Sequence, residues 1–362
     1  MKTAIVVDWL TQMGGAERVV LAIKELFPEA PIFATVYNPD TVDKVFHNMD
    51  IRTSFIQKLP GAKKSYQKYL PLMPTAVEQF DLGEFDLVLS SSSSVAKGIL
   101  TRAEAVHVCY CHTPMRYAWD FYQEYLNGPD VGTLKRKLIP WLMNYLRMWD
   151  RLTADRVDYF IANSANVARR IKKHYHRDSV VINPPVEASF FKPGDTDGDY
   201  FLVVSRLVPY KRVDIAIEAC NELGLPLRVI GTGPEFDRLK GMAGPTVKMM
   251  GRLSEEDIKA HYSQCRAFLF PGEEDFGITP LEAQASGRPV IAFGKGGAVE
   301  TVVEGETGLF FAEQTADSLK NGIKRFENTG FDRKVIRQHA EKYDKVSFQN
   351  ALKAFLGSIG KC

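Results

Sequence analysis

Short runs of apolar, β-branched residues alternate with segments of helical periodicity along the whole chain. Such runs are typical of parallel strands buried on both faces, with a helix after each strand to cover the sheet. In the first half the expected strands are residues 3–10, 85–91, 105–111, 158–164 and 180–186. In the second half they are residues 199–207, 226–233, 247–253, 267–272, 288–294 and 307–312. The pattern predicts an α/β protein with two doubly wound parallel sheets.

The alternation is interrupted by a segment rich in Pro, Gly and Asp between residues 183 and 199. A chain of 362 residues also suits two domains of roughly 150–180 residues better than a single core. We expect an N-terminal domain over 1–185, a linker over 186–198, a C-terminal domain over 199–345 and a final amphipathic helix over 346–362. In doubly wound sheets ligands bind beyond the carboxyl ends of the strands, so motifs that follow a strand are the candidates for chemistry.

Composition narrows the classes of protein. A net charge of +2 with a pI near 8.1 gives no electrostatic case for nucleic acid. No apolar run reaches the ~18 residues of a transmembrane helix, and the N-terminus is typical of a strand and not of a signal peptide. The cysteines are odd in number and none has redox or zinc spacing: Cys109, Cys111, Cys220, Cys265 and Cys362. A reduced, cytosolic protein is favoured.

Two motifs follow strands of the first half. Gly14 and Gly15 come after the first strand and allow a close approach of the backbone to a ligand. A tight turn without a ligand is the simpler explanation of an isolated Gly-Gly pair, and the spacing is not the GxGxxG of a dinucleotide site. His112 follows the strand 105–111 beside Arg116 and aromatic residues, where it could contact a sugar or serve as a structural histidine.

Two further motifs follow strands of the second half. Arg206 comes after one strand and Lys211 lies near the next helix start. An Arg fork with a movable Lys suits a diphosphate, although two solvated cations are the alternative. Gly231 and Gly233 end the next strand before Pro234, and a simple turn accounts for them with a phosphate as a secondary possibility.

The stretch GEEDFGITPLEA, from Gly272, places Glu274 in a loop and Glu282 one turn into a helix that begins near Ile278 and Thr279. Carboxylates accept hydrogen bonds from vicinal diols, and the free N–H groups of a helix start suit a phosphate. We expect the two carboxylates to bracket one elongated ligand. Glu273 and Asp275 are explained by solvation of the helix start.

No metal site is expected. The sequence DTD at residues 195–197 resembles a metal-binding DxD but lies in the Pro/Gly segment. No cluster of His, Cys and carboxylates has metal spacing, and no GxxxxGK[ST] phosphate loop occurs.

Two windows of the first half carry basic residues and no acidic ones, residues 57–77 and 131–149. The first contains Lys58, Lys63, Lys64 and Lys68 with Tyr66 and Tyr69, and the second contains Lys135, Arg136, Lys137 and Arg147 with Trp141, Tyr145 and Trp149. Basic residues with an aromatic face suit an anionic membrane surface. The alternative is a surface helix whose aromatic side is buried.

Together these motifs resemble glycosyltransferase family 4, retaining enzymes with two Rossmann-like domains facing a central cleft, the GT-B fold. The resemblance rests on the Gly-Gly loop, the strand-end His112, the Arg206 and Lys211 pair, and the two glutamates with seven residues between them. CYCHTPMRYAWD with GEEDFGITPLEAQASGRPVIAFGKGGAVET is most similar to the mannosyltransferase branch of bacterial O-antigen and exopolysaccharide synthesis. Asp275 stands where many relatives have Gly, which leaves the glutamate spacing intact.

The resemblance implies a role for each matching residue. In the second domain Arg206, Lys211 and the amides near Ile278 and Thr279 would hold the donor diphosphate. Glu282 would take the ribose hydroxyls and Glu274 the donor sugar. The remaining donor-site residues are expected to be Phe276, Gly277, Gly231 and Gly233. From the first domain Gly14 and Gly15 would approach donor and acceptor, and His112 would lie near the sugar. A last helix often crosses back to the first domain in this architecture.

The implied reaction needs no cofactor and no metal, because Arg206, Lys211 and helix amides would stabilise the departing diphosphate. The implied partners are a nucleotide-sugar donor, with GDP-mannose favoured and a UDP-sugar as the alternative, a lipid-linked glycan acceptor and the inner face of the cell membrane. A nucleotide-sugar epimerase or hydrolase of the same fold and a non-catalytic nucleotide-sugar-binding protein are the rival functions.

Overall fold

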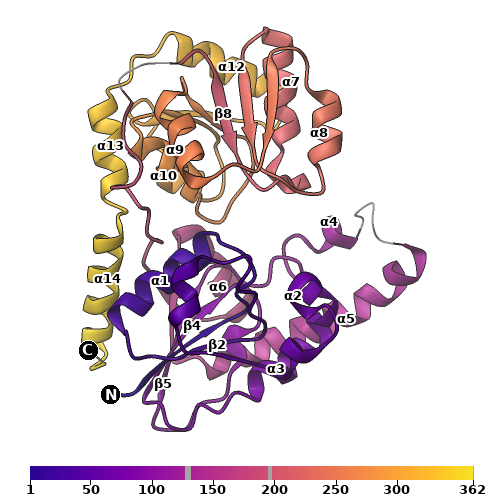
Figure 1. Ribbon diagram of the computed structural model, residues 1–362, viewed down its shortest axis with the longest axis vertical. Helices are drawn as coiled ribbons and strands as arrows, with labels where there is room; N and C mark the ends of the chain where they lie inside the picture. The colour runs from indigo at the N-terminus through magenta and orange to yellow at the C-terminus, as the bar shows by residue number, and fades with distance from the viewer. Residues whose placement is uncertain (127–131, 195–197, 362) are drawn as a thin grey trace. The chain divides into compact units, whose positions relative to one another are not determined.

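The computed structural model describes residues 1–126, 132–194 and 198–361 (Figure 1). The DTD sequence at 195–197 and Cys362 therefore lie outside the described residues. Contacts divide the chain into two compact units, Met1–Asn183 with Gln349–Cys362, and Pro184–Phe348. Val186, Ala188 and Phe191, within the stretch expected as a linker, are buried in clusters of the second unit.

The first unit contains a seven-stranded parallel sheet in the order β3-β2-β1-β4-β5-β6-β7. The strands are β1 Thr3–Val7, β2 Ile32–Ala34, β3 Ile51–Thr53, β4 Leu87–Ser92, β5 Val106–Cys111, β6 Tyr159–Ala162 and β7 Ser179–Val181. Ile5 of β1 pairs with Ile32 on one side and with Leu89 on the other. The five expected strands are confirmed. The strands β2 and β3 were not expected; β3 is an edge strand that contains the exposed Arg52 and shows no apolar run.

The helices of the first unit are α1 Gly15–Leu26, α2 Ala62–Ser65, α3 Met73–Glu78, α4 Tyr122–Leu126, α5 Thr133–Thr153 and α6 Ala165–Tyr175. Short 3₁₀ helices are η1 Lys44–Asn48, η2 Phe55–Lys58, η3 Tyr66–Leu72, η4 Ala96–Gly98 and η5 Ala154–Arg156. The last helix, α14 Lys345–Ser358, packs on this unit from Gln349 onward, where the Gln349 amide donates to the carbonyl of Ala22 at 3.1 Å.

The second unit contains a six-stranded parallel sheet in the order β10-β9-β8-β11-β12-β13. The strands are β8 Phe201–Val204, β9 Leu227–Ile230, β10 Val247–Gly251, β11 Phe268–Phe270, β12 Val290–Phe293 and β13 Gly308–Phe311. The helices are α7 Val213–Leu223, α8 Phe236–Met242, α9 Glu255–Gln264, α10 Ile278–Ala285, α11 Ala298–Thr301, α12 Ala316–Glu327 and α13 Arg333–Glu341, with η6 Pro209–Lys211. All six expected strands are confirmed.

Both faces of the second sheet are buried, as the continuous apolar runs predict. Val203 and Ile291 pack in a cluster with residues of α7 and α12, while their neighbours Leu202 and Val290 pack in another cluster with residues of α9 and α10. Figure 1 shows these two pairs of helices on opposite sides of the sheet. Successive residues of a strand point to opposite faces, so one run of apolar residues serves both layers.

Each sheet reverses its strand order at one place. The reversal lies between β1 and β4 in the first unit and between β8 and β11 in the second. A crevice opens at such a switch point because the loops on its two sides run to opposite faces of the sheet, and ligands bind there. The Gly-Gly loop follows β1, whereas Arg206 and Glu274 follow β8 and β11. The expected motifs thus flank the two switch points.

Within the described residues, no helix has the length and apolar character needed to cross a membrane. Cys109, Cys111, Cys220 and Cys265 are buried and form no disulfide.

Candidate active site

An ion pair joins the two sides of the second switch point. Lys211 ends η6, after β8, and its ammonium contacts the carboxylate Oε1 of Glu274, which lies in the loop after β11. The side chains are 20% and 14% exposed, so solvent screens their attraction less than it would screen a surface pair. Gly272 lets the loops meet, because a Cβ there would lie 2.9 Å from the Cα of Lys211. The structure therefore brings Lys211 and Glu274 together.

Arg206 lies in the loop between β8 and η6, and its side chain is exposed. This loop is braced by the turn after β9, where the amide of Leu207 donates to the carbonyl of Thr232 at 3.0 Å. A Cβ on Gly231 would lie 1.8 Å from the carbonyl oxygen of Ser205, and one on Gly233 would lie 2.2 Å from that of Leu207. The two glycines therefore shape the loop that carries Arg206, a packing role that needs no contact with a ligand.

The helix α10 begins beside Glu274. Its N-cap, Gly277, has a φ of 93°, and no side chain caps the helix. Its first turn carries no acidic residue, and Ile278 and Thr279 supply N–H groups while Pro280 cannot. Unpaired N–H groups and the helix dipole favour an anion at such an end. Because the Lys211 ammonium contacts Glu274 three residues before Gly277, a cation and a helix start lie on neighbouring segments.

The backbone of the loop that carries Glu274 is held in place by a buried side chain and by a neighbouring loop. The ring of Phe276 is buried against Val186 and Leu281, so this side chain anchors the loop in the core. The amide of Gly297 donates to the carbonyl of Glu274 at 2.8 Å, and a Cβ on Gly297 would lie 2.2 Å from the Cα of Phe276. The sequence analysis missed Gly272 and Gly297. Their positions in the sequence could have indicated them, because each glycine follows a strand, β11 or β12.

Glu282 lies in the second turn of α10 and is buried. Its Oε2 accepts a hydrogen bond from the hydroxyl of Tyr262, on α9, at 3.0 Å. Tyr262 is fully buried, which makes its hydroxyl a fixed donor that orients the carboxylate. Sequence patterns could not single out Tyr262, since a buried Tyr on an amphipathic helix is ordinarily a core residue.

At the first switch point two carboxylates are turned inward. Asp8, at the end of β1, is buried and accepts hydrogen bonds from the amides of Ser93, Val95 and Ala96 at 2.6–2.7 Å. Burial raises the pKa of Asp8, and these amides oppose the rise. The loop after β4, residues 93–96, which we call the serine loop, thus wraps around a carboxylate. Its amides are occupied by Asp8.

Glu17 lies in the first turn of α1, whose N-cap is Gly14 and whose first residue is Gly15. Its carboxylate accepts from the amide of Gly14, the reciprocal half of a capping box. Burial, together with the nearby charge of Asp8, raises the pKa of Glu17 to about 7. The Gly-Gly loop therefore has its conformation set by Glu17, a residue to which the sequence analysis gave no role.

His112 follows β5, and its Nε2 lies 2.7 Å from the hydroxyl of Ser91. Burial lowers the pKa of His112 to about 4, which keeps the imidazole neutral at physiological pH. With Glu17 and Asp8 it lines a cavity of about 30 Å³, room for a single water molecule. His112 thus shares a small cavity with Glu17, the residue whose carboxylate holds the amide of Gly14.

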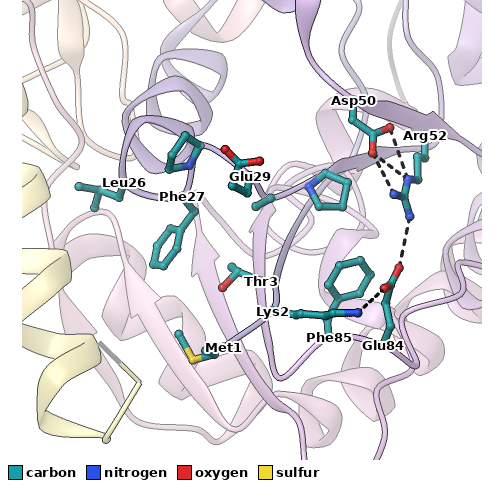
Figure 2. Close-up of a pocket in the computed structure, with 13 residues that line it drawn as sticks. Met1, Lys2, Thr3, Leu26, Phe27, Glu29, Asp50, Arg52, Glu84 and Phe85 are labelled. Atoms are coloured by element: carbon teal, nitrogen blue, oxygen red, sulfur yellow. Dashed lines mark hydrogen bonds and ion pairs between the residues drawn. The ribbon is translucent and has the colours of Figure 1, made fainter.

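A second cavity of the first unit, of about 460 Å³, lies where no site was expected. It is at the amino ends of the strands, around Lys2 and Thr3 (Figure 2). Two ion pairs lie at this cavity, Lys2 with Glu84 at 3.0 Å and Arg52 with Asp50 at 2.9 Å. These four side chains of its lining therefore pair with one another. The motifs that could carry chemistry lie at the opposite ends of the strands.

Among the described residues, no group of three or more His, Cys, Asp and Glu side chains is arranged to hold a metal ion.

Comparison with known proteins identifies the two halves of the chain. Residues 13–190 match the family described as Glycosyltransferase Family 4, and residues 186–343 match the family described as Glycosyl transferases group 1. The solved structure of Anabaena Alr3699/HepE in complex with UDP and glucose is similar over 99% of this chain and 100% of its own, with a TM-score of 0.72 at 18% identity. Each half thus matches a glycosyltransferase family model, and the chain has the GT-B fold.

Curated relatives are similar over shorter stretches. An uncharacterized glycosyltransferase, MJ1178, of Methanocaldococcus jannaschii is 25% identical over 225 residues, which are 61% of this chain and 62% of the relative. A GDP-mannose-dependent alpha-(1-6)-phosphatidylinositol monomannoside mannosyltransferase of Mycolicibacterium smegmatis is 34% identical over 146 residues, 35% of this chain and 38% of the relative. The matches span less than two thirds of either relative.

Proposed function

We propose that this protein is a retaining glycosyltransferase that moves a hexose from a nucleotide sugar to an acceptor hydroxyl without a metal. The observation that carries the proposal is the Lys211–Glu274 pair at the second switch point, directly before an uncapped helix start that offers the amides of Ile278 and Thr279. A cation and free amides suit a diphosphate, and a carboxylate beside them suits the hydroxyls of the sugar attached to it.

The proposed division of labour follows from this chemistry. The second domain binds the donor, with Arg206 and Lys211 on the diphosphate, Glu282 on the ribose hydroxyls and Glu274 on the sugar. The first domain binds the acceptor, with Gly14 and Gly15 as its loop and His112 near the sugar. Neutral His112 can donate one hydrogen bond to a hydroxyl. Gly231, Gly233 and Phe276 support the donor site through the backbone.

In the proposed reaction the bond between the anomeric carbon and the diphosphate breaks, and the acceptor oxygen attacks from the same face. The acceptor proton passes to the departing phosphate oxygen, so the products are a retained glycoside and a nucleoside diphosphate. Lys211, Arg206 and the helix amides stabilise the negative charge that develops on the leaving group. Preorganised donors of this kind are worth about 10²–10³ in rate for each group removed.

The donor we propose is GDP-mannose. The mannosyltransferase of Mycolicibacterium smegmatis, named for GDP-mannose, supports this choice. The HepE structure was solved with UDP and glucose, which supports a UDP-sugar as the second candidate. The acceptor we propose is a lipid-linked glycan of bacterial O-antigen or exopolysaccharide synthesis, reached from the inner face of the cell membrane.

A thermal-shift panel of GDP, UDP, GDP-mannose and UDP-hexoses tests the donor, because a ligand that binds only the folded protein stabilises it by RT ln(1 + [L]/Kd). We expect the largest shift with GDP-mannose. A shift with UDP-sugars alone would replace the GDP-mannose proposal. Donor consumption that proceeds equally fast without acceptor would instead indicate the epimerase or hydrolase function.

The variant Glu274→Gln tests whether the protein is an enzyme at all. We expect it to keep its fold and lose transfer, while Glu273→Gln, on the exposed neighbour, keeps both. Full biological activity of Glu274→Gln would favour a non-catalytic nucleotide-sugar-binding protein.

A further inference from the structure

The helix α5 carries a row of exposed apolar side chains. They are between 43% and 79% exposed and lie three or four residues apart: Leu138, Trp141, Tyr145, Met148 and Leu152. At 3.6 residues per turn these positions fall within an arc of roughly 80°, over a length of about 21 Å. We call this row the α5 stripe. Contiguous exposed apolar surface of this kind marks an interaction site more often than isolated exposed residues do.

The α5 stripe is separate from the buried face of α5, which packs on the core of the first unit. Met143 and Leu146 are buried in the core cluster of the first unit. Asp150 is fully buried, pairs with Lys97 at 2.8 Å and accepts from the indole of Trp119 at 2.7 Å. These contacts fix the rotation of the helix about its axis. The stripe therefore stays outward without any movement of α5 (magenta in Figure 1).

Along the stripe from Leu138 to Met148 the exposed charges are basic, and Asp155, just beyond Leu152, is paired with Arg151 at 3.0 Å. Between Thr133 and Trp149 the helix contains no acidic residue, and its single carboxylate, Asp150, is neutralised in the core. Arg136 and Lys137 are exposed near the start of the stripe, and Lys137 lies about 40° beyond Trp141 around the helix axis, at 100° per residue. A long basic side chain beside an apolar row can extend its ammonium to lipid phosphates while the row is buried.

This charge also argues against a second copy of the chain as the occupant. Two copies of a helix whose exposed charges near the stripe are basic would place like charges together, which is unfavourable. Trp141 and Tyr145 are the residue types that concentrate at the boundary between lipid and water, since each has an apolar ring and a polar tip. The features together fit an anionic lipid surface.

The other basic window, residues 57–77, has a different structure. Its lysines Lys63 and Lys64 are exposed, but the ring of Tyr66 packs on Trp9 at 4.6 Å and the hydroxyl of Tyr69 donates to Pro60 at 2.7 Å. The aromatic residues of this window are thus engaged by the protein, as the alternative interpretation held. It can supply charge without inserting its rings.

We propose that the α5 stripe is the membrane-docking element of the protein and that it inserts into the interfacial layer of a bilayer containing anionic lipid. The lysines around residues 63 and 64 add electrostatic attraction only. The biological purpose of this docking rests on the proposed lipid-linked acceptor, whereas the docking itself is measured without donor or acceptor.

The test is sedimentation with vesicles of phosphatidylethanolamine and phosphatidylglycerol, with pure phosphatidylcholine vesicles as the uncharged comparison. The variant Leu138→Ser/Trp141→Ser/Met148→Ser is expected to bind the anionic vesicles at least tenfold more weakly. The matched control replaces three exposed valines elsewhere, Val45→Ser/Val299→Ser/Val335→Ser, and is expected to bind like the unaltered protein. Lys63→Glu/Lys64→Glu is expected to weaken binding less, with the deficit disappearing at high salt.

Three results would overturn the proposal. They are failure of the unaltered protein to bind anionic vesicles, equal binding by the stripe variant, and loss of a dimer in the stripe variant with vesicle binding unchanged. The last would assign the stripe to contact between copies. Thermal shift with GDP-mannose and UDP-sugars on the same variants distinguishes failure of the docking proposal from failure of the proposed function. Nucleotide binding that survives the loss of docking leaves the proposed glycosyltransferase function intact.

Discussion

At the first switch point, between β1 and β4, the charged groups are turned into the protein, whereas at the second, between β8 and β11, they lie where a ligand can reach them. Asp8 is buried among the amides of the serine loop, and Glu17 is buried at the start of α1. Arg206 is exposed, and Lys211 and Glu274 are partly exposed. One topology therefore supports two kinds of site, one whose carboxylates are buried and satisfied by the protein and one whose charged groups are accessible to a diphosphate.

The difference has a physical origin. A buried carboxylate is tolerated only when amides or hydroxyls satisfy it, and the first unit uses its serine loop for this purpose. The second unit leaves the start of α10 uncapped and places a cation beside it. Its N–H groups are thereby available to an external anion. The following predictions test whether this contrast governs function and stability.

The largest effect is expected from removing the charged pair. Lys211→Ala should lower kcat for transfer about 10³-fold, because the departing diphosphate loses a preorganised cation. Steady-state kinetics with GDP-mannose measure it, and Lys248→Ala, on an exposed lysine of β10, is the control. A Lys211→Ala variant with normal kcat and a raised KM would show that the cation binds donor without acting on the transition state.

The next effect concerns the packing that shapes the Arg206 loop. Gly231→Ala would bring a Cβ to 1.8 Å from the carbonyl oxygen of Ser205 and should lower the free energy of unfolding by about 3 kcal/mol or more. Gly241→Ala, where a Cβ meets nothing within 4 Å, should leave stability unchanged or slightly raised. Urea denaturation distinguishes them. Equal stability of both variants would mean that the loops are not in contact.

A third prediction concerns the pH dependence of stability that the buried Glu17 confers at the first switch point. In the folded protein the pKa of Glu17 is raised from 4.5 to about 7, so folding favours the protonated form. The stabilisation is present below pH 4.5 and is lost as the pH rises through 7. Glu17→Gln, which cannot ionise, should therefore gain stability relative to the unaltered protein between pH 5 and pH 8, by about 2 kcal/mol.

Urea midpoints at the two pH values measure this gain, with Glu29→Gln, on an exposed residue that follows α1, as the control. A difference between Glu17→Gln and the unaltered protein that stays constant with pH would contradict the prediction.

The smallest effect is expected at Glu282. Tyr262→Phe removes the hydroxyl that orients this carboxylate, and one such hydrogen bond is worth about 1 kcal/mol. The affinity for nucleoside diphosphate should fall roughly fivefold with little change in kcat. Isothermal titration with GDP and UDP measures it, and Tyr159→Phe, on a partly exposed tyrosine of β6, is the control. Unchanged affinity would remove Glu282 from the donor site.

The extent of sequence prediction can be judged from particular elements. The strands from β4 to β13 were expected because each is a continuous apolar run between turn residues, and these runs report burial on both faces. The strand β3 was missed because its residues, with the exposed Arg52 in the middle, form no apolar run, and β2 was missed although its residues are apolar. The roles expected for Arg206, Lys211, Glu274 and Glu282 came from motif resemblance, and they stay predictions until the variants are measured.

The sequence by itself determined the two parallel sheets and the loops that carry the chemistry, because the hydrophobic pattern and the turn residues are local signals. Only the tertiary structure decided which side chains meet. Contact between Lys211 and Glu274 depends on two loops that Gly272 allows to approach across 63 residues. The outward stripe of α5 depends on how Asp150 and Leu146 lock the helix. Spacing along the chain specifies the face of a helix, whereas packing decides which apolar face is buried.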